Sequence, residues 1–321
     1  MAYAIRHVTR YRYSAPIVES HMEVRMHPRS EGPQRCWDFR LRTSPRAKIG
    51  SYRDSLGNAV SFFDVPGRHA KLTITAEANV EFTPMIEIPD ALDPSAWAGL
   101  DAVARDEDHW EFLAPSKFAN ATPLLETLRA EIDLDRGHDP LSTLRDLNHT
   151  LYDRLAYAPK TTRVDSPIDE ALEARQGVCQ DFSHIMIALV RGLGIPARYV
   201  SGYLYHGDDC NDRSVRSATH AWVEAYLPGL GWVGFDPTND LIAADRHIRV
   251  AVGRDYADVP PTRGVFTGDA TGEISVDVKV EPSEATLLDE GPTSNVWLAV
   301  DPDEQVGMME LLQDQQQQQQ Q

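Results

Sequence analysis

The fold is decided by residues 177–204, which read GVCQDFSHIMIALVRGLGIPARYVSGYL. Cys179 opens an apolar run whose members recur at spacings of three and four residues, typical of one face of a helix. Those members are Phe182, Ile185, Met186, Leu189, Val190 and Leu193. Two more apolar residues widen this face, so we expect a helix that is buried nearly all round. Gly194, followed by a proline two residues later, predicts where the helix ends.

A cysteine at the start of a buried helix has unusual chemical surroundings. The N-terminus of a helix carries roughly half a positive charge, and its first N–H groups have no partner within the helix. Both effects favour the thiolate of Cys179 over the thiol. The same N–H groups can also receive an oxyanion. We therefore interpret Cys179 as a nucleophile.

Length and composition limit the classes of protein to consider. A chain of 321 residues suggests two domains, or one domain and a large extension, and 42% hydrophobic residues can form a sizeable core. No run of 18 apolar residues occurs, so we expect no membrane span. The N-terminus lacks the apolar segment of a secretory signal. The net charge of −18 argues against nucleic-acid binding.

The cysteines indicate a compartment and argue against some kinds of site. Cys36, Cys179 and Cys210 are odd in number and far apart, which fits neither a disulfide framework nor a zinc-ligand spacing. A reducing, cytoplasmic compartment fits this pattern. Cys210 lies among Asp208, Asp209 and Asp212 in a polar loop that lacks a full calcium-ligand pattern. We predict no metal and no cofactor.

The order of elements predicts an α+β protein with an antiparallel β domain at residues 1–85. Five segments in that domain alternate in polarity and are separated by turn signals: 3–13, 21–27, 37–43, 59–65 and 72–82. A linker with helices follows at 86–139. The catalytic core is expected at 140–282, with its nucleophile helix packed on an antiparallel sheet or barrel. Residues 283–321, acidic and ending in seven glutamines, are expected to be a disordered tail.

Strands and helices are expected around the nucleophile helix as well. Asp139-Pro140 and Ser166-Pro167 are start signals for two helices before Cys179. Alternating or apolar segments predict strands after it, at 197–205, 219–227, 232–236 and 274–280. We expect residues 237–265 to be rich in loops.

A thiolate nucleophile needs a base and a group that orients this base. His184 lies five residues after Cys179, about 140° around the helix, so it cannot easily reach the sulfur. We interpret it as a residue that packs the helix or supports the site residues. His220 begins one strand and Asp236 ends the next, so both lie at the same edge of one hairpin. We predict that they are the base and its orienting acid.

The turn between these strands must meet a parity condition. Side chains alternate between the faces of a strand, so the two residues share a face only if the turn holds an odd number of residues or a bulge intervenes. Pairing of Tyr226 with Leu230 would place His220 directly opposite Asp236. Pairing of Tyr226 with Trp232 would place them on a diagonal. We predict one of these two registers.

The motifs resemble those of the transglutaminase-like branch of the papain-type cysteine enzymes. GVCQDF, GIPARYVSGYL and THAWVEAYLPGLGWVGFDPTN carry the resemblance over residues 140–240. Upstream, HVTRYRYSAPI, RMHPRS, YRDSLGNAV and DVPGRHAKL resemble the β domain that precedes this core in bacterial members. The resemblance therefore covers about 280 residues and points to the bacterial subfamily rather than the calcium-dependent animal enzymes.

The resemblance implies a thiol acyl-transfer site. Cys179 would attack a peptide or carboxamide carbonyl and form a thioester, His220 would protonate the leaving amine, and Asp236 would orient His220. The N–H of Cys179 would be the first oxyanion donor. The second stays open between Tyr157 and Gln180.

Three further residues lie close to these motifs in the sequence. Trp222 is expected to pack the wall of the site or to shield the ion pair. Asp181 and Glu224 either support the site or are ordinary helix-start and strand-surface acids.

These features favour a peptidase or amidase acting on a peptide or protein, without nucleic acid or membrane as partner. A protein-crosslinking transglutaminase and a non-catalytic binding module of the same fold are the alternatives. A structural adaptor that uses the acidic tail to bind its partner is a further one. Neither the substrate nor the oligomeric state follows from the sequence.

Overall fold

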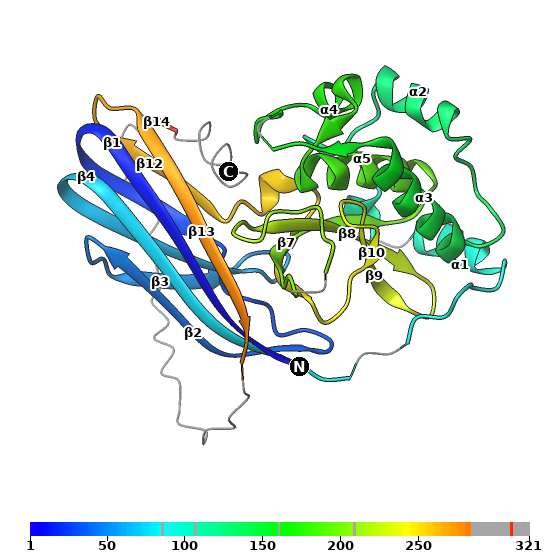
Figure 1. Cartoon of the computed structure of the whole chain (residues 1–321), viewed down its shortest axis with the longest axis horizontal. Coiled ribbons are helices and arrows are strands. Elements are labelled where there is room, and N and C mark those ends of the chain that lie inside the picture. Colours follow the sequence, from blue (N-terminus) through cyan, green and yellow to red (C-terminus); the bar gives the residue numbers. More distant parts are fainter. Residues whose placement is uncertain (85–86, 106–107, 160, 208–209, 284–308, 311–321) are drawn as a thin grey trace. The chain divides into compact units, whose positions relative to one another are not determined.

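The chain folds into two compact units (Figure 1). A computed structural model describes residues 1–84, 87–105, 108–159, 161–207, 210–283 and 309–310. The first unit contains Met1–Thr83 together with residues from Pro260 onward, and the second unit contains Pro84–Val259. The mixture of helices and antiparallel sheets confirms the expected α+β class.

The first unit is a sheet organised around two long antiparallel strands, β1 (Ala2–Val24) and β4 (Ala59–Phe82). β2 (Gln34–Ser44) and β3 (Ile49–Arg53) pair with the two ends of β4. β13 (Gly272–Pro282) and β12 (Thr262–Thr267) pair with the two ends of β1. One face of this sheet packs a core that includes Tyr11, Phe63 and Ile74.

Each long strand replaces two shorter strands that the sequence predicts. The register of β1 against β4 shifts between Arg12 and Glu19, opposite Pro66, and Gly67 has φ 88°. Such bulges bend a strand without ending it, and glycine adopts positive φ at little cost. The Pro-Gly signal is therefore a bend inside β4 rather than the turn that we expected.

The expected end of the catalytic core is wrong in the structure. The segment 274–280 is a strand, as predicted, but it belongs to β13 and pairs along β1 of the first unit, with Ile274 opposite Tyr11. Alternating polarity predicts a strand but does not identify its partner. The second unit ends at Val259, whereas we expected the core to continue to residue 282.

The tail predicted at 283–321 lies almost entirely outside the described residues. Within it, the backbone of β14 (Met309–Glu310) pairs with β12.

The second unit packs helices against a five-stranded antiparallel sheet with the order β10-β9-β8-β7-β11 (Figure 1). The strands are β7 (Ala197–Leu204), β8 (His220–Leu227), β9 (Gly231–Asp236), β10 (Leu241–Ile242) and β11 (His247–Gly253). The helices are α1 (Ala96–Val103), α2 (Pro123–Glu131), α3 (Pro140–Arg154), α4 (Ile168–Ala174) and α5 (Cys179–Gly192), with 3-10 turns η1 (Trp110–Phe112) and η2 (Tyr256–Asp258). α5 contacts β7 and β8 and is buried as predicted.

Local signals fix several helix ends in the second unit. Asp139 accepts hydrogen bonds from the N–H groups of Leu141 and Ser142 at the start of α3, as predicted. Gly194, with φ 79°, follows the end of α5. α4 differs from expectation, because Pro167 rather than Ser166 occupies its N-cap. No helix in the described parts of the chain is both long and apolar enough to cross a membrane.

Candidate active site

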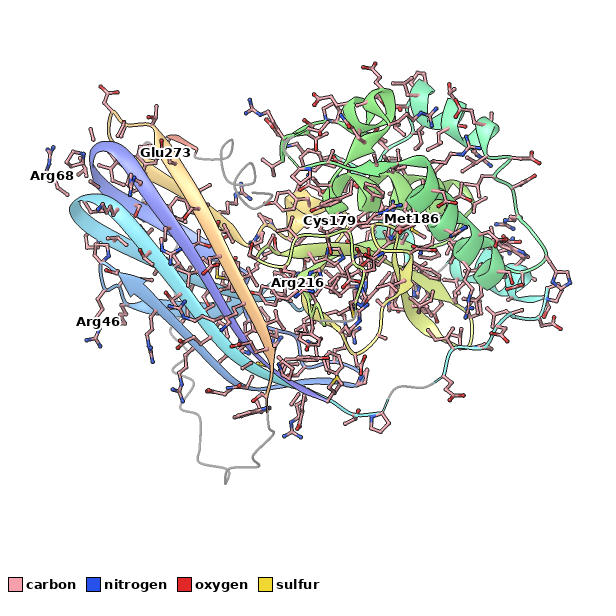
Figure 2. The ribbon with its side chains drawn as sticks, in the orientation of Figure 1. Arg46, Arg68, Cys179, Met186, Arg216 and Glu273 are labelled. Carbon is pink, nitrogen blue, oxygen red and sulfur yellow. The ribbon has the colours of Figure 1, made fainter. Side chains whose placement is uncertain are left out.

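Cys179, labelled in Figure 2, is the first residue of α5, and a network of buried polar contacts surrounds the turn before it. Asp181 Oδ2 accepts hydrogen bonds from Val178 N at 2.9 Å and from Thr162 Oγ1 at 2.6 Å. A Cβ atom on Gly177 would lie only 2.7 Å from this carboxylate, so the approach requires glycine. Burial raises the pKa of Asp181 to about 6. Asp181 therefore holds the turn into the nucleophile helix.

The hairpin of β8 and β9 has one of the two predicted registers. Tyr226 pairs with Trp232, and a turn of three residues, 228–230, connects the strands. This register places His220 and Asp236 on the same face and on a diagonal. His220 Nε2 and Asp236 Oδ2 are 2.7 Å apart, and both residues are buried. The structure thus brings together the base and the acid that the sequence predicts.

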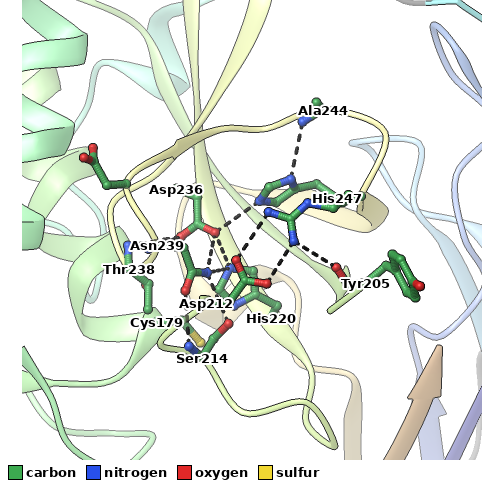
Figure 3. A network of polar contacts seen from close by, with 12 residues as sticks. Cys179, Tyr205, Asp212, Ser214, His220, Asp236, Thr238, Asn239, Ala244 and His247 are labelled. Carbon is green, nitrogen blue, oxygen red and sulfur yellow. Dashed lines mark hydrogen bonds and ion pairs between the residues drawn. The ribbon is translucent and has the colours of Figure 1, made fainter. Parts of the chain in front are cut away.

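Asp236 is surrounded by hydrogen-bond donors (Figure 3). Its Oδ1 accepts from the main-chain N–H groups of Thr238, at 3.0 Å, and Asn239, at 3.3 Å. Its Oδ2 accepts from the Asn239 amide at 2.8 Å and lies 3.1 Å from His247 Nε2. Burial alone would raise the pKa of Asp236, but His220 and His247 together hold it well below its usual range. Asp236 is therefore a carboxylate.

His220 interacts with both this carboxylate and the Cys179 thiol. Burial opposes its charged form, but the Asp236 carboxylate and, after it, the Cys179 thiol outweigh burial and raise the pKa of His220. Its Nδ1 is buried and has no hydrogen-bond partner among the described residues. Nε2 is thus held by Asp236, while Nδ1 is left for the thiol. Figure 3 shows Cys179 and His220 in the same cluster.

His247 is a component of the site that the sequence analysis missed. Its Nδ1 accepts a hydrogen bond from the N–H of Ala244 at 3.3 Å, so the proton of the neutral ring is on Nε2 and is donated to Asp236. Burial lowers the pKa of His247. His247 begins β11, which lies in the segment that we expected to be loops. The alternation of Ile248, Val250 and Val252 was a signal that could have revealed this strand.

Asn239 is a second missed component. Its amide nitrogen donates to Asp236 and to Ser214 Oγ, at 2.8 and 3.1 Å. Its carbonyl oxygen accepts from the main-chain N–H groups of Arg213, at 2.8 Å, and Ser214, at 3.2 Å. Asn239 therefore ties the loop before β8 to the Asp236 carboxylate. Its place in DPTND, directly after Asp236, was the available sequence signal.

The two candidates for a second oxyanion donor have different surroundings. The Gln180 side chain is buried and donates to Val164 O at 3.0 Å, so its amide holds a neighbouring loop. Tyr157 forms β5 (Ala156–Tyr157), which pairs with β6 (Gln176–Gly177), just before Cys179. Burial, then the Cys179 thiol, raise the pKa of Tyr157 well above its usual value. Tyr157 is thus a protonated hydroxyl near the thiol.

Other candidates have supporting or structural contacts. Trp222 is fully buried, and its ring packs edge-on against His247 with centroids 5.2 Å apart. Glu224 forms a buried ion pair with Arg198 at 2.6 Å, away from the hydrogen bonds of Asp236. His184 stacks on Phe118 and accepts from the N–H of Tyr256, which agrees with its interpretation as a packing residue.

Metal-ligand groupings are few in the described residues. His220, Asp236 and His247 are the one group of three whose ligand atoms lie within 4.8 Å of one another, and their mutual hydrogen bonds account for this closeness. Asp212 forms an ion pair with Arg246 at 2.9 Å. Asp208 and Asp209, the other acids weighed for calcium, lie outside the described residues.

Two families of known proteins match this chain. Residues 129–237 match the transglutaminase-like superfamily, and residues 3–81 match the bacterial transglutaminase-like N-terminal region. A protein-glutamine gamma-glutamyltransferase of Pseudomonas aeruginosa is 35% identical over 85 residues, which is 25% of this chain and 12% of that protein. The match to the transglutaminase-like superfamily includes the motifs around Cys179, His220 and Asp236.

Two similarities extend over most of the chain. An uncharacterized protein of Mycobacterium leprae is 33% identical over 279 residues, 85% of this chain and 96% of the relative. The crystal structure of a Cytophaga hutchinsonii protein, provisionally described as a cysteine protease, has the same fold. Its TM-score is 0.67 at 22% identity, over 89% of this chain and 92% of that one. The chain therefore belongs to the bacterial transglutaminase-like family, with its N-terminal β region and its transglutaminase-like core.

Proposed function

We propose that this protein is a cysteine-dependent acyl-transfer enzyme that cleaves peptide or carboxamide bonds. The arrangement around His220 carries the proposal. Its Nε2 lies 2.7 Å from a buried carboxylate, and its Nδ1 is the nitrogen left to exchange a proton with a thiol at the start of a helix. A thiol, a base and an orienting carboxylate in this order are what nucleophilic catalysis requires.

The roles follow from the chemistry of the three side chains. Cys179 attacks the acyl carbon as a thiolate, while His220 keeps the transferred proton. His220 then gives this proton to the leaving amine, which departs as the thioester forms. Asp236 keeps the ring in place and stabilises its charge. Water then attacks the thioester carbon, and the acid and the free thiol are released.

The oxyanion that forms in each step needs donors already in position. The N–H of Cys179 at the start of α5 is the first. Tyr157 is the better candidate for the second, because the Gln180 amide already donates to Val164 O. Replacement of Tyr157 by Phe should lower kcat with little change in KM, since an oxyanion donor acts mainly in the transition state.

Transamidation is the second candidate function. It differs only in the acceptor, an amine instead of water. The short match to a protein-glutamine gamma-glutamyltransferase motivates it. We favour hydrolysis over transamidation. The cytoplasmic location stays a prediction from the sequence.

Alkylation of Cys179 tests the proposal without knowledge of the substrate. At pH 6, iodoacetamide should label Cys179 faster than free cysteine, and His220→Ala should abolish the difference. Cys36 is an internal control, because burial raises the pKa of its thiol to about 12. If Cys179 reacts no faster than free cysteine, the chain is a binding module rather than an enzyme. A screen of peptide and isopeptide amides, against Cys179→Ala and with or without an added amine, then separates hydrolysis from crosslinking.

A further inference from the structure

We infer that the acyl substrate carries a carboxylate, which binds in an arginine-lined pocket beside the nucleophile. This inference rests on the proposed function and adds a substrate class to it. The pocket has a volume of about 530 Å³ and lies at the C-terminal end of α3. Its lining includes Arg154, Arg175, Arg213 and Tyr157.

The pocket adjoins the nucleophile through the short pairing of β5 with β6. Tyr157 lines the pocket and pairs with Gly177, and the N–H of Ala158 donates to Gly177 O at 2.9 Å. Cys179 follows two residues later, at most about 7 Å of extended chain. Tyr157 thus lines the pocket and is also near enough to Cys179 that, after burial, the thiol raises its pKa. A ligand in this pocket can place an acyl carbon at Cys179.

Arg213 is held in an orientation suited to bind a carboxylate. Its Nη1 donates to the main-chain oxygens of Tyr152, at 2.7 Å, and Leu155, at 3.4 Å, which lie at the end of α3. Its guanidinium lies over the ring of Tyr152, 3.3 Å from the centroid. The hydrogen bonds of its side chain within the described residues both come from Nη1, so the edge formed by the Nε and Nη2 N–H groups remains for a ligand. A guanidinium fixed in advance loses little entropy on binding.

The other arginines add positive charge to the pocket. Arg154 is exposed and forms no hydrogen bond or ion pair within the described chain. Arg175 is paired with Glu131 at 2.7 Å. Asp153 is the one acid in the lining, and it lies 3.4 Å from His149. On a chain of net charge −18, a pocket lined by three arginines and one acid is locally attractive to an anion.

Hydrogen bonds link this pocket to the catalytic residues. Asn239 donates a hydrogen bond to Asp236 (Figure 3). It also accepts one from the main-chain N–H of Arg213. The loop that carries Arg213 and the carboxylate that orients His220 are therefore held by one side chain. This fixes the anion-binding group relative to the base. Acidic peptides, with an aspartyl or glutamyl side chain or a free C-terminal carboxylate, have the matching chemistry.

A matched pair of alkylating reagents tests the pocket. Iodoacetyl-glutamate α-amide and iodoacetyl-glutamine α-amide differ in one carboxylate, and the rate of labelling of Cys179 is measured with each. After correction by the rates of free cysteine, we expect the carboxylate reagent to react about tenfold faster, as a charged hydrogen bond allows. The preference should fall in 1 M salt.

Variants locate the effect in the pocket. Arg213→Gln and Arg154→Gln should each reduce the preference, and the double variant should bring it close to one. Arg154 has no described contact, so its replacement should not affect folding. Arg68→Gln, an exposed arginine of the first unit (Figure 2), removes the same charge and should leave the preference unchanged.

The ratio of the two corrected labelling rates and the absolute labelling rate test different claims. Equal corrected rates in the wild type, or a preference that survives the double variant, would overturn the pocket. The absolute rate tests the proposed function instead. A carboxylate preference at a Cys179 that is no more reactive than free cysteine would support the pocket and overturn the enzyme.

A peptide screen adds a second arm. Peptides with glutamate in place of glutamine, and peptides with a free in place of an amidated C-terminus, show which carboxylate the pocket takes. Faster turnover of the carboxylate member of either pair would support the pocket, provided that Arg154→Gln reduces the difference. Equal turnover of both members of each pair would count against it.

Discussion

His220 and His247 share one oxygen of Asp236, at 2.7 and 3.1 Å from their Nε2 atoms. The two rings differ in the surroundings of their other nitrogen, Nδ1. His220 has its other nitrogen free for the thiol, whereas the N–H of Ala244 occupies the other nitrogen of His247. His247 is thus a neutral donor that positions Asp236, and we propose that His220 is the ring that changes its charge.

Replacement of His247 should slow the enzyme without changing its nucleophile. His247→Ala removes one donor from a buried carboxylate, and a hydrogen bond to a charged group contributes about 1.5–3 kcal/mol. We expect the rate of Cys179 alkylation at pH 6 to fall about tenfold or more. His247→Gln can still donate an N–H and should recover part of the rate. An unchanged rate of Cys179 alkylation in His247→Ala would mean that the hydrogen bond from His247 to Asp236 is not needed for a reactive thiol.

The pH profile of alkylation should depend on Asp236. Although burial favours the neutral ring, this carboxylate raises the pKa of His220, so the imidazolium persists as the pH rises above 6.5. The wild-type rate should therefore change little between pH 6 and 8. In Asp236→Asn the charge is lost, the pKa of His220 falls, and the rate should increase with pH as for an ordinary thiol. Alkylation rates of both proteins, measured between pH 6 and 8, give the shape of each pH profile. Parallel profiles in the wild type and Asp236→Asn would contradict the role assigned to Asp236.

His184 should make the fold sensitive to acid. Its burial lowers its pKa to about 3, whereas the unfolded ring has a pKa near 6.5. The unfolded state therefore binds a proton more readily, and stability falls as the pH drops from 6.5 toward 3. At pH 5 the loss amounts to about 2 kcal/mol.

A denaturant titration from pH 7 to pH 4 measures this contribution. His184→Gln, which keeps an acceptor for the N–H of Tyr256 but does not titrate, should lose stability less steeply. This variant also loses the stacking on Phe118, which lowers its stability at every pH. The loss of stability on acidification is therefore measured for each protein relative to its own value at pH 7. Equal slopes in the two proteins would show that His184 is not responsible.

Gly202 should not tolerate a side chain. It lies opposite His220 on the neighbouring strand, and a Cβ atom there would be 2.1 Å from Ile248 O and 2.7 Å from the Trp222 ring. Gly202→Ala should lower the free energy of unfolding by about 3 kcal/mol, because main chain must move. It should also slow Cys179 alkylation, since Trp222 packs against His247.

Gly192→Ala is the matched control for this change. The nearest atom to its added Cβ is 3.8 Å away, and alanine favours a helix more than glycine does. Its stability should stay equal or increase. If Gly202→Ala unfolds at the same denaturant concentration as Gly192→Ala and the wild type, the close approach at Gly202 does not affect the stability of the fold.

The residues of the site could be predicted where the chemistry is local. Cys179 follows from a helix start, and the parity of the turn before Trp232 was enough to limit His220 and Asp236 to two registers, one of which the structure has. His247 could not be found in this way. It reaches Asp236 only because β11 pairs with β7, and a contact between such strands leaves no fixed spacing in the sequence. Asn239 lies three residues after Asp236 in the same turn, so its signal was local.

The sequence by itself determined the helix that begins at Cys179, its ends and the hairpin that carries His220 and Asp236, because periodicity, caps and turn parity are local properties. Only the tertiary structure decided which sheet takes each strand. Residues 272–282 alternate as any strand would, yet they complete the sheet of the first unit, since hydrogen-bonding edges accept any strand that fits their register and burial. The same reason applies to the pocket, whose arginines are brought together by the packing of α3, α4 and the loop before β8.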